Sequence, residues 1–103
     1  MPESLTRIFF TQALNTNFLL HTEAGEIVEL ELIEVKDGIS TPKQEQFSIM
    51  FRGPSGFILP QQTYSLEHDP IGAFDLFIVP VGRDPAGTYY EAVFNRFIQA
   101  RKG

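Results

Sequence analysis

Residues 46–95 constrain the fold of this chain most strongly, because four apolar runs alternate there with turns built on Gly and Pro. The runs recur about every ten residues, which is the spacing typical of an all-β sandwich or barrel. In the first run Phe47, Ile49 and Phe51 alternate with more polar residues, which indicates one face toward a core and one toward water. This half of the chain therefore predicts a compact antiparallel β architecture.

The N-terminal part predicts a short helix followed by a hairpin. Residues 4–14 place apolar side chains at the spacing of one helical face, and Ser4 is a suitable N-cap: Leu5, Ile8, Phe9 and Ala13 form that face. Asn15 tolerates the left-handed backbone that ends a helix. Two further apolar runs, 17–22 and 27–36, flank Gly25 and indicate a hairpin.

The second strand of this hairpin changes its apolar face. Val28, Leu30 and Leu32 share one face, after which Ile33 and Val35 become the apolar positions. Because side chains in a strand alternate with a period of two, the switch indicates a bulge or bend near residues 32 and 33. A strand that changes its buried face suits the corner of a closed or tightly wrapped sheet.

Three segments complete the expected architecture. Residues 37–44 contain Gly38 and Pro42 and are interpreted as a polar surface loop. Apart from Asp75, residues 73–81 are apolar on both faces and predict a central strand, covered by sheet on one side and by the helix or a partner on the other. Residues 96–103 form a basic tail. We expect a single domain over residues 1–103, mainly β, with about six antiparallel strands in a small barrel or sandwich and one short N-terminal helix.

Composition excludes several classes of function. A net charge of −5 with dispersed basic residues argues against a nucleic-acid partner. The longest uncharged apolar run, residues 76–81, is far short of the roughly 20 residues that span a bilayer. The absence of cysteine rules out thiolate metal sites and disulfides. No secretory signal is visible, and the sequence does not decide the location, with the cytoplasm and a larger assembled particle as the alternatives.

Few side chains are candidates for chemistry. His68 lies between Glu67 and Asp69, a setting in which a histidine serves as a general base or metal ligand. Strand neighbours point to opposite faces, however, so Glu67 and His68 do not readily share a ligand, and we interpret His68 as structural. A zinc site from His21, His68 and a carboxylate would need an unobserved contact across the fold. No nucleophile elbow or phosphate-binding loop is recognised, and we expect no metal and no cofactor.

Exposed aromatic residues favour binding over catalysis. Tyr89 and Tyr90 are adjacent in a strand, so one of the two is expected at the surface. Phe57 lies in a turn region rich in Gly and Pro and is a second candidate for exposure. Aromatic side chains are enriched at interfaces because they offer large contact area at low entropic cost. With His68 and Arg52, these residues form the set of interaction candidates, although packing within a thin core is the alternative for the aromatic ones.

The same half of the chain carries a family resemblance. Its motifs are F-x-x-x-F-x-G-P at 47–54, L-P-Q-x-x-Y-x-L-E-H at 59–68, L-F-x-V-P-V-G at 76–82 and Y-E-A-V-F-N at 90–95. In these motifs the chain resembles an uncharacterised family of short bacterial proteins, a domain of unknown function. The resemblance implies a genomic setting beside proteins similar to phage tail-collar or tail-fibre proteins, and it implies no activity.

Two functions of different class remain open. The first is a non-enzymatic structural or protein-interaction module, an accessory of a phage-tail-like or surface assembly. It self-associates or binds a protein partner by strand addition at a sheet edge. The second is a small-ligand binding protein or simple hydrolase with a site around His68, Glu67 and Arg52.

Overall fold

The computed structural model describes residues 6–41, 44–70 and 72–97. One helix and six strands follow one another along the chain: α1 (Arg7–Gln12), β1 (Asn17–His21), β2 (Ile27–Thr41), β3 (Gln44–Gly53), β4 (Gln62–His68), β5 (Gly72–Asp84) and β6 (Gly87–Phe97). All strand pairs are antiparallel, and the strands form one closed sheet in the order β1-β2-β3-β6-β5-β4. The expected mainly β fold with one short N-terminal helix is confirmed.

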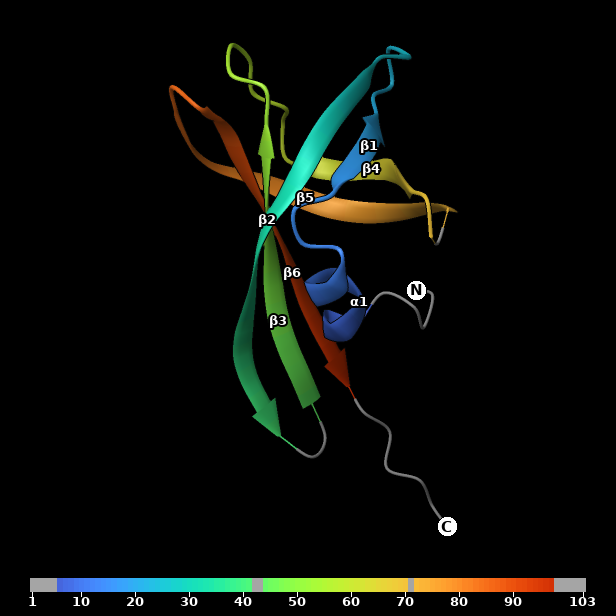
Figure 1. Cartoon of the computed structure of the whole chain (residues 1–103), viewed down its shortest axis with the longest axis vertical. Helices are drawn as coiled ribbons and strands as arrows, with labels where there is room; N and C mark the ends of the chain where they lie inside the picture. The colour runs from blue at the N-terminus through green and yellow to red at the C-terminus, as the bar shows by residue number, and fades with distance from the viewer. Residues whose placement is uncertain (1–5, 42–43, 71, 98–103) are drawn as a thin grey trace.

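The sheet is closed at one end and splayed at the other. A short pairing of β1 with β4, from Leu19 opposite Glu67 to His21 opposite Ser65, completes the ring. β2, β3 and β6 continue beyond this ring as a long three-stranded arm, while β5 turns away from β6 (Figure 1). Helix α1 lies beside this arm, below the ring, and Phe10 of the helix is fully buried.

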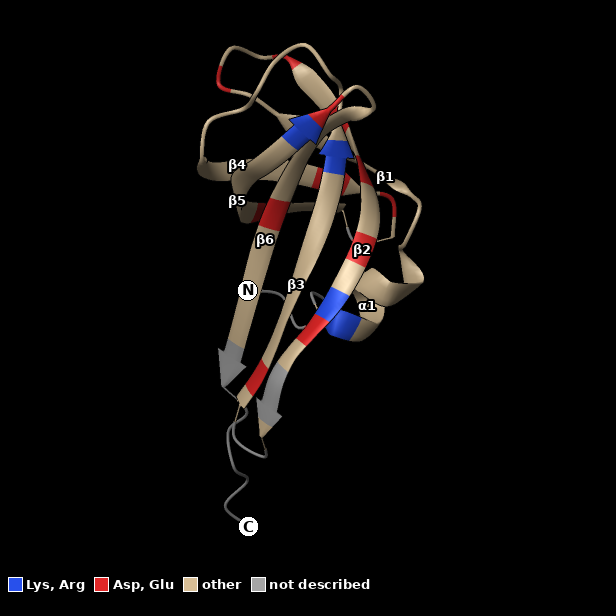
Figure 2. Ribbon diagram, turned by 90° about the vertical axis from the view of Figure 1, so that its left-hand side faces the viewer, with Lys and Arg blue, Asp and Glu red and all other residues tan. Residues whose placement is uncertain are grey.

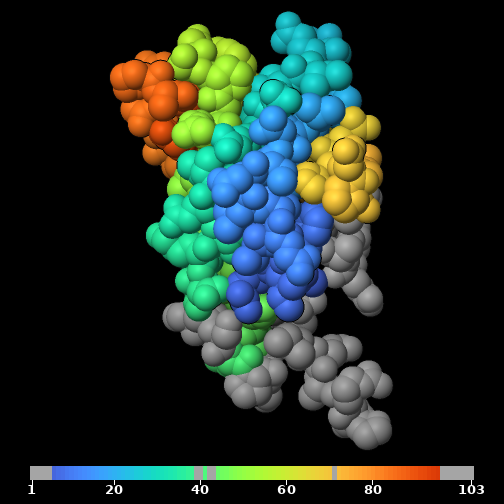
Figure 3. Space-filling model, viewed as in Figure 1, coloured from blue at the N-terminus to red at the C-terminus, as the bar shows by residue number. Residues whose placement is uncertain are grey.

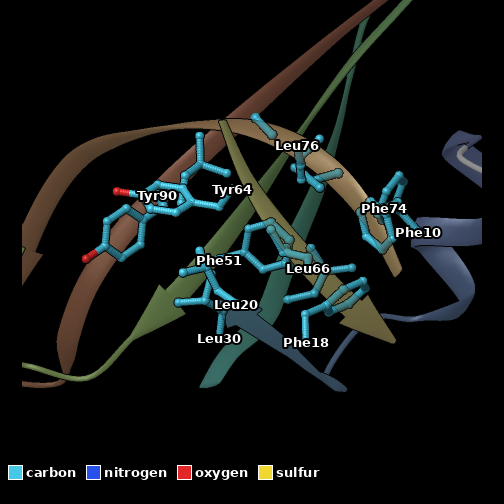
Figure 4. Packing of buried hydrophobic residues seen from close by; sticks show 14 of the residues in the cluster. Phe10, Phe18, Leu20, Leu30, Phe51, Tyr64, Leu66, Phe74, Leu76 and Tyr90 are labelled. Carbon is cyan, nitrogen blue, oxygen red and sulfur yellow. The ribbon is translucent and has the colours of Figure 1, made fainter. Parts of the chain in front are cut away.

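The core is built by the alternation that the sequence predicted. Inward positions of β3 and β4 are buried, whereas their neighbours are partly or largely exposed: Phe47, Ile49, Phe51, Tyr64 and Leu66 point inward. Aromatic side chains extend through this core from Tyr90 and Tyr64 at one end to Phe10 at the helix (Figure 4). Because Phe10 contacts the rings of Phe18, Phe47 and Phe94 at centroid distances of 5.2–6.2 Å, the helix acts as an apolar plug.

The predicted change of face in β2 is confirmed as a break in register. Leu32 pairs with Phe51 and Glu34 with Met50, so Ile33 is the extra residue of a β-bulge. Leu32 is fully buried, whereas Val35, beyond the bulge, is only partly buried and packs against the edge of the core. The bulge bends β2 from the ring into the arm.

The helix begins later than predicted. Thr6, not Ser4, is the N-cap, and its hydroxyl accepts a hydrogen bond from the N–H of Phe9 at 3.2 Å. Ser4 and Leu5 lie outside the described residues. Ile8 was assigned to the buried face but is 62% exposed, because the short helix turns Phe10 inward instead. Asn15 has φ of 67° and ends the helical segment as expected.

Two other expectations were wrong. Residues 37–44 are mostly strand, since β2 continues to Thr41 and β3 starts at Gln44, with pairing on both sides of a second register shift between Asp37 and Ser40. The helix does not cover the outer face of β5: it packs against β2, and the outward Phe77 of β5 is 49% exposed. Cover of this face by a partner, the other alternative, stays a prediction.

The basic tail also starts as strand. Arg96 and Phe97 belong to β6 and pair through their backbone with Glu45 and Gln44 of β3. Residues 98–103, and residues 42–43 of the predicted loop, lie outside the described residues. Within the described residues, no helix has the length and apolar character that a membrane crossing requires.

Candidate functional site

A cleft of about 650 Å³ opens beside the short seam between β1 and β4. Residues 16, 17 and 19 form one wall, Glu29 of β2 another, and the end of β4 with the turn into β5 the third: Glu67, His68, Asp69, Pro70 and Gly72. Figure 3 looks onto this face, where β1 in blue borders the β4–β5 turn in yellow. Three carboxylates line the cleft, so its electrostatic potential favours cations over anions.

His68 lies at the inner wall of this cleft and is held by the turn that follows α1. Its Nε2 is 3.0 Å from the hydroxyl of Thr16, and that hydroxyl is 2.6 Å from the carbonyl oxygen of Ala13. A carbonyl oxygen only accepts, so the single hydroxyl proton of Thr16 goes to Ala13. His68 therefore donates from Nε2, and the neutral ring carries its lone pair on Nδ1.

The Nδ1 atom of His68 is buried and has no hydrogen-bond partner among the described residues. The ring packs against Phe18, at a centroid distance of 4.2 Å, and meets the edge of Phe9 at 5.5 Å. Burial lowers the pKa of His68 below 6.5, and the nearby Asp69 carboxylate, which raises it, does not compensate. His68 is thus a neutral ring at pH 7, placed between an aromatic wall and a hydroxyl.

His21 and Glu67 form a separate pair on the outside of the seam. The Nε2 of His21 is 3.0 Å from Oε1 of Glu67, and both side chains are more than one third exposed. The zinc site considered from the sequence would need His21 and His68 to bind one metal ion. Instead, His21 is hydrogen-bonded to Glu67 and His68 to Thr16. Within residues 6–41, 44–70 and 72–97 no three His, Asp or Glu side chains converge on a metal-sized position.

Arg52 does not join His68 and Glu67. Its Nη2 donates to Oε1 of Glu31 at 2.6 Å, and Arg52 is absent from the residues that line the cleft. The three-residue site predicted as the alternative is therefore not assembled in this structure. Arg52 lies one residue before the end of β3 and pairs with Tyr89 of β6. Figure 2 shows Lys and Arg positions in blue at the ends of two strands, at the far end of the molecule from the arm.

The paired tyrosines point to opposite faces, as expected. Tyr89 is partly exposed, and its hydroxyl donates to the carboxylate of Asp84 at 2.9 Å, which raises the pKa of Tyr89. Tyr90 was named as an interaction candidate, but it is 1% exposed, so it cannot contact a partner directly. Its register opposite Phe51, an inward residue of β3, explains why Tyr90 and not Tyr89 enters the core.

The loop 54–61 carries the most exposed aromatic candidate. Phe57 is 42% exposed and the neighbouring Ile58 is 47% exposed, whereas Leu59 is buried. Residues on β4 and β6 hold the backbone of this loop. The hydroxyl of Tyr90 accepts from Leu59 N–H at 2.9 Å, Thr88 donates to the Phe57 carbonyl at 3.0 Å, and Tyr64 donates to the Pro60 carbonyl at 2.6 Å.

These tethers make the loop a fixed platform rather than a free segment. The rings of Tyr64 and Tyr90 lie side by side at one end of the core with their hydroxyls pointing the same way (Figure 4). The sequence pointed to Phe57 but not to Thr16 or Thr88. Thr16 and Thr88 contact residues 52 and 31 positions away, so no local pattern could identify them.

The model of one protein family, described as a domain of unknown function (DUF6916), matches residues 5–94. No curated protein and no solved structure matches the chain. The match spans the helix, the ring and β6 as far as residue 94, and therefore includes the cleft and the loop 54–61.

Proposed function

Because the chain belongs to the DUF6916 family, whose description carries no activity, we propose its function from the structure: a non-enzymatic protein-interaction module that presents the loop 54–61 to a protein partner. The observation that carries the proposal is the exposure of Phe57 and Ile58 at the tip of a loop held by three side-chain hydrogen bonds. In keeping with its family resemblance, we propose an accessory of a phage-tail-like or surface assembly as its setting.

Exposed apolar side chains raise the free energy of the unbound protein, and a rigid loop loses little conformational entropy on binding. Two adjacent large apolar side chains in water are unfavourable unless a partner removes them from solvent, and such side chains are frequent binding anchors. A flexible loop would lose conformational entropy on binding, whereas this loop is already ordered by Tyr64, Thr88 and Tyr90. The loop geometry needed for binding is thus supplied by the core itself.

Strand addition is a second way in which the same module could engage a partner. The part of β6 after Glu91 pairs with β3 and, within the described residues, with no strand on its other side. Val93 on this part of β6 is 70% exposed. A β6 edge without a neighbour can accept an extended segment by backbone hydrogen bonding.

The test uses matched exposed positions. Purified products of the adjacent genes are measured for binding to the wild type, to a Phe57→Ser/Ile58→Ser variant, and to Phe77→Ser, which removes an equally exposed aromatic ring from the outer face of β5. We expect the loop variant to lose at least tenfold in affinity and the Phe77 variant to keep its affinity. Light scattering measures self-association of the same three proteins.

Two outcomes would contradict the proposal. If the protein is strictly monomeric and binds none of these products, the proposal of an interaction module is wrong. Binding that survives Phe57→Ser/Ile58→Ser but fails in Phe77→Ser would move the interface to the outer face of β5. Circular dichroism of each variant establishes that the fold is retained.

A second candidate function is binding of a small cationic ligand in the cleft, and the carboxylates of Glu29, Glu67 and Asp69 favour it. Hydrolysis by a Thr16–His68 pair is disfavoured, because Nε2 of His68 donates to Thr16 and so does not act as its base. A ligand screen by NMR, with a Glu29→Gln variant as control, separates the candidates: cleft binding predicts chemical-shift changes around His68 that this variant weakens.

A further inference from the structure

The end of β4 and the turn after α1 are joined by one short polar connection. His68 is the last residue of β4, and Thr16 immediately precedes β1. The chain of bonds runs from His68 Nε2 to the Thr16 hydroxyl and on to the carbonyl of Ala13, the C-cap of the helix. The His68 ring also meets the edge of Phe9, a residue of the helix itself. His68 therefore contacts the helix at Phe9 and the turn after the helix at Thr16.

The connection suits only the neutral ring. With Nε2 donating to Thr16, a second proton has to sit on Nδ1, where the described residues offer no acceptor and solvent does not reach. A buried N–H without a partner is unfavourable, and a charged one more so. Protonation therefore acts against the packed position of the ring between Phe18 and Phe9.

We propose that His68 is a pH-sensitive latch, which holds helix α1 against the splayed end of the barrel when its ring is neutral and releases the helix when the ring is protonated. Release of the helix exposes the aromatic core residues that it covers. Phe10 is fully buried and contacts Phe18, Phe47 and Phe94, so an open helix exposes apolar rings on both the ring and the arm. This regulatory role is independent of the loop 54–61.

The charged groups around His68 and the burial of its ring have opposite effects on its protonation. Asp69 in the turn after β4 favours the protonated ring, and Glu67 on β4 and Glu29 on β2 line the same cleft. Glu67 is engaged with His21 of β1, and the face of Phe18 also attracts a cation. On α1 the charged residue is Arg7, which pairs with Asp37 at 3.3 Å, away from the cleft. Burial outweighs the attraction of Asp69, in agreement with the lowered pKa of His68.

The experiment compares amide hydrogen exchange of the full chain between pH 7.5 and 5, corrected for intrinsic exchange rates. Phe10 N–H, bonded to the Thr6 carbonyl, and Ala13 N–H, bonded to Phe9, report helix opening. Leu59 N–H, bonded to Tyr90 in the loop at the other end of the core, is the internal reference. We expect the opening constant of the helix to rise by up to about tenfold per pH unit below 6.5, while that of Leu59 does not change.

Three variants make the test decisive. His68→Gln retains an N–H donor for Thr16 and His68→Phe retains a ring, and neither titrates, so helix opening in both is expected to lose its pH dependence. If one of them fails to fold, the other still decides. His21→Gln is the matched control, because it removes the other histidine, and it is expected to keep the wild-type pH dependence.

Direct NMR titration of the His68 ring completes the test. A His68 pKa at or above 6.5 overturns the latch, because protonation would then stabilise the closed helix. The same conclusion follows if helix opening keeps its pH dependence in His68→Phe, or if it loses that dependence in His21→Gln.

Discussion

Replacing Tyr90 with Phe removes one oxygen from the base of the loop 54–61. The Tyr90 hydroxyl accepts the N–H of Leu59 at 2.9 Å, and both residues are buried, with exposures of 1% and 6%. Water cannot reach the freed N–H, so the variant carries the full desolvation cost of an unpaired buried donor, about 1–3 kcal/mol. Tyr89→Phe is the matched control, since its hydroxyl bonds to Asp84 at an exposed position, where water replaces the lost partner.

Urea unfolding measures this difference. A domain of this size has an m-value of roughly 1–3 kcal/mol per M, so a loss of about 2 kcal/mol lowers the midpoint by roughly 1 M. We expect such a shift for Tyr90→Phe, no shift for Tyr89→Phe, and unchanged m-values for both. Equal midpoints of the two variants would refute the claim that the Tyr90 hydroxyl anchors the loop, and would remove the rigidity on which the proposed interface depends.

Three further predictions concern other parts of the barrel. Gly87→Ala places a Cβ over the backbone oxygen of Gly53, which a rotamer change cannot relieve, so thermal denaturation should show a loss of about 1–3 kcal/mol. Burial lowers the pKa of His68 in the folded state, so the unfolded chain takes up a proton first as the pH falls through 6.5. The free energy of unfolding should therefore decrease below pH 6.5 and be independent of His68 above it. Chemical denaturation at several pH values measures this dependence. A double-mutant cycle of Arg52 and Glu31 to Ala should give a coupling of only about 0.2–1 kcal/mol despite the 2.6 Å contact, because both side chains are about one third exposed, and a value above about 2 kcal/mol would contradict this.

Local patterns predicted the strands well because they depend on the backbone of a single segment. Alternation marked Phe47, Ile49 and Phe51 as inward, and the change of apolar face near Leu32 marked the bulge. Residues 37–44 were predicted as a loop because they are polar and contain Gly. Their ends belong to β2 and β3, and these two strands pair with each other, which supplies the backbone hydrogen bonds that the segment would not obtain alone. Tertiary pairing thus overrode the turn signal at Gly38.

The candidate site was less accessible from sequence than the fold. His68 was recognised as a position of interest, but its partner Thr16 lies 52 residues away and is placed by closure of the barrel. Likewise, adjacency in a strand requires Tyr89 and Tyr90 to face opposite ways, and only the register with Phe51 decides that Tyr90 is inward.

By itself, the sequence determined a small antiparallel β domain with a helix at its start, because side-chain periodicity and the conformational limits of Gly, Pro and Asn act over a few residues. The tertiary structure alone decided that β1 and β4 close the ring, that Phe10 plugs its splayed end, and that Phe57 and Ile58 stand on a tethered loop. These features depend on strand register and packing between distant segments, which no local spacing encodes.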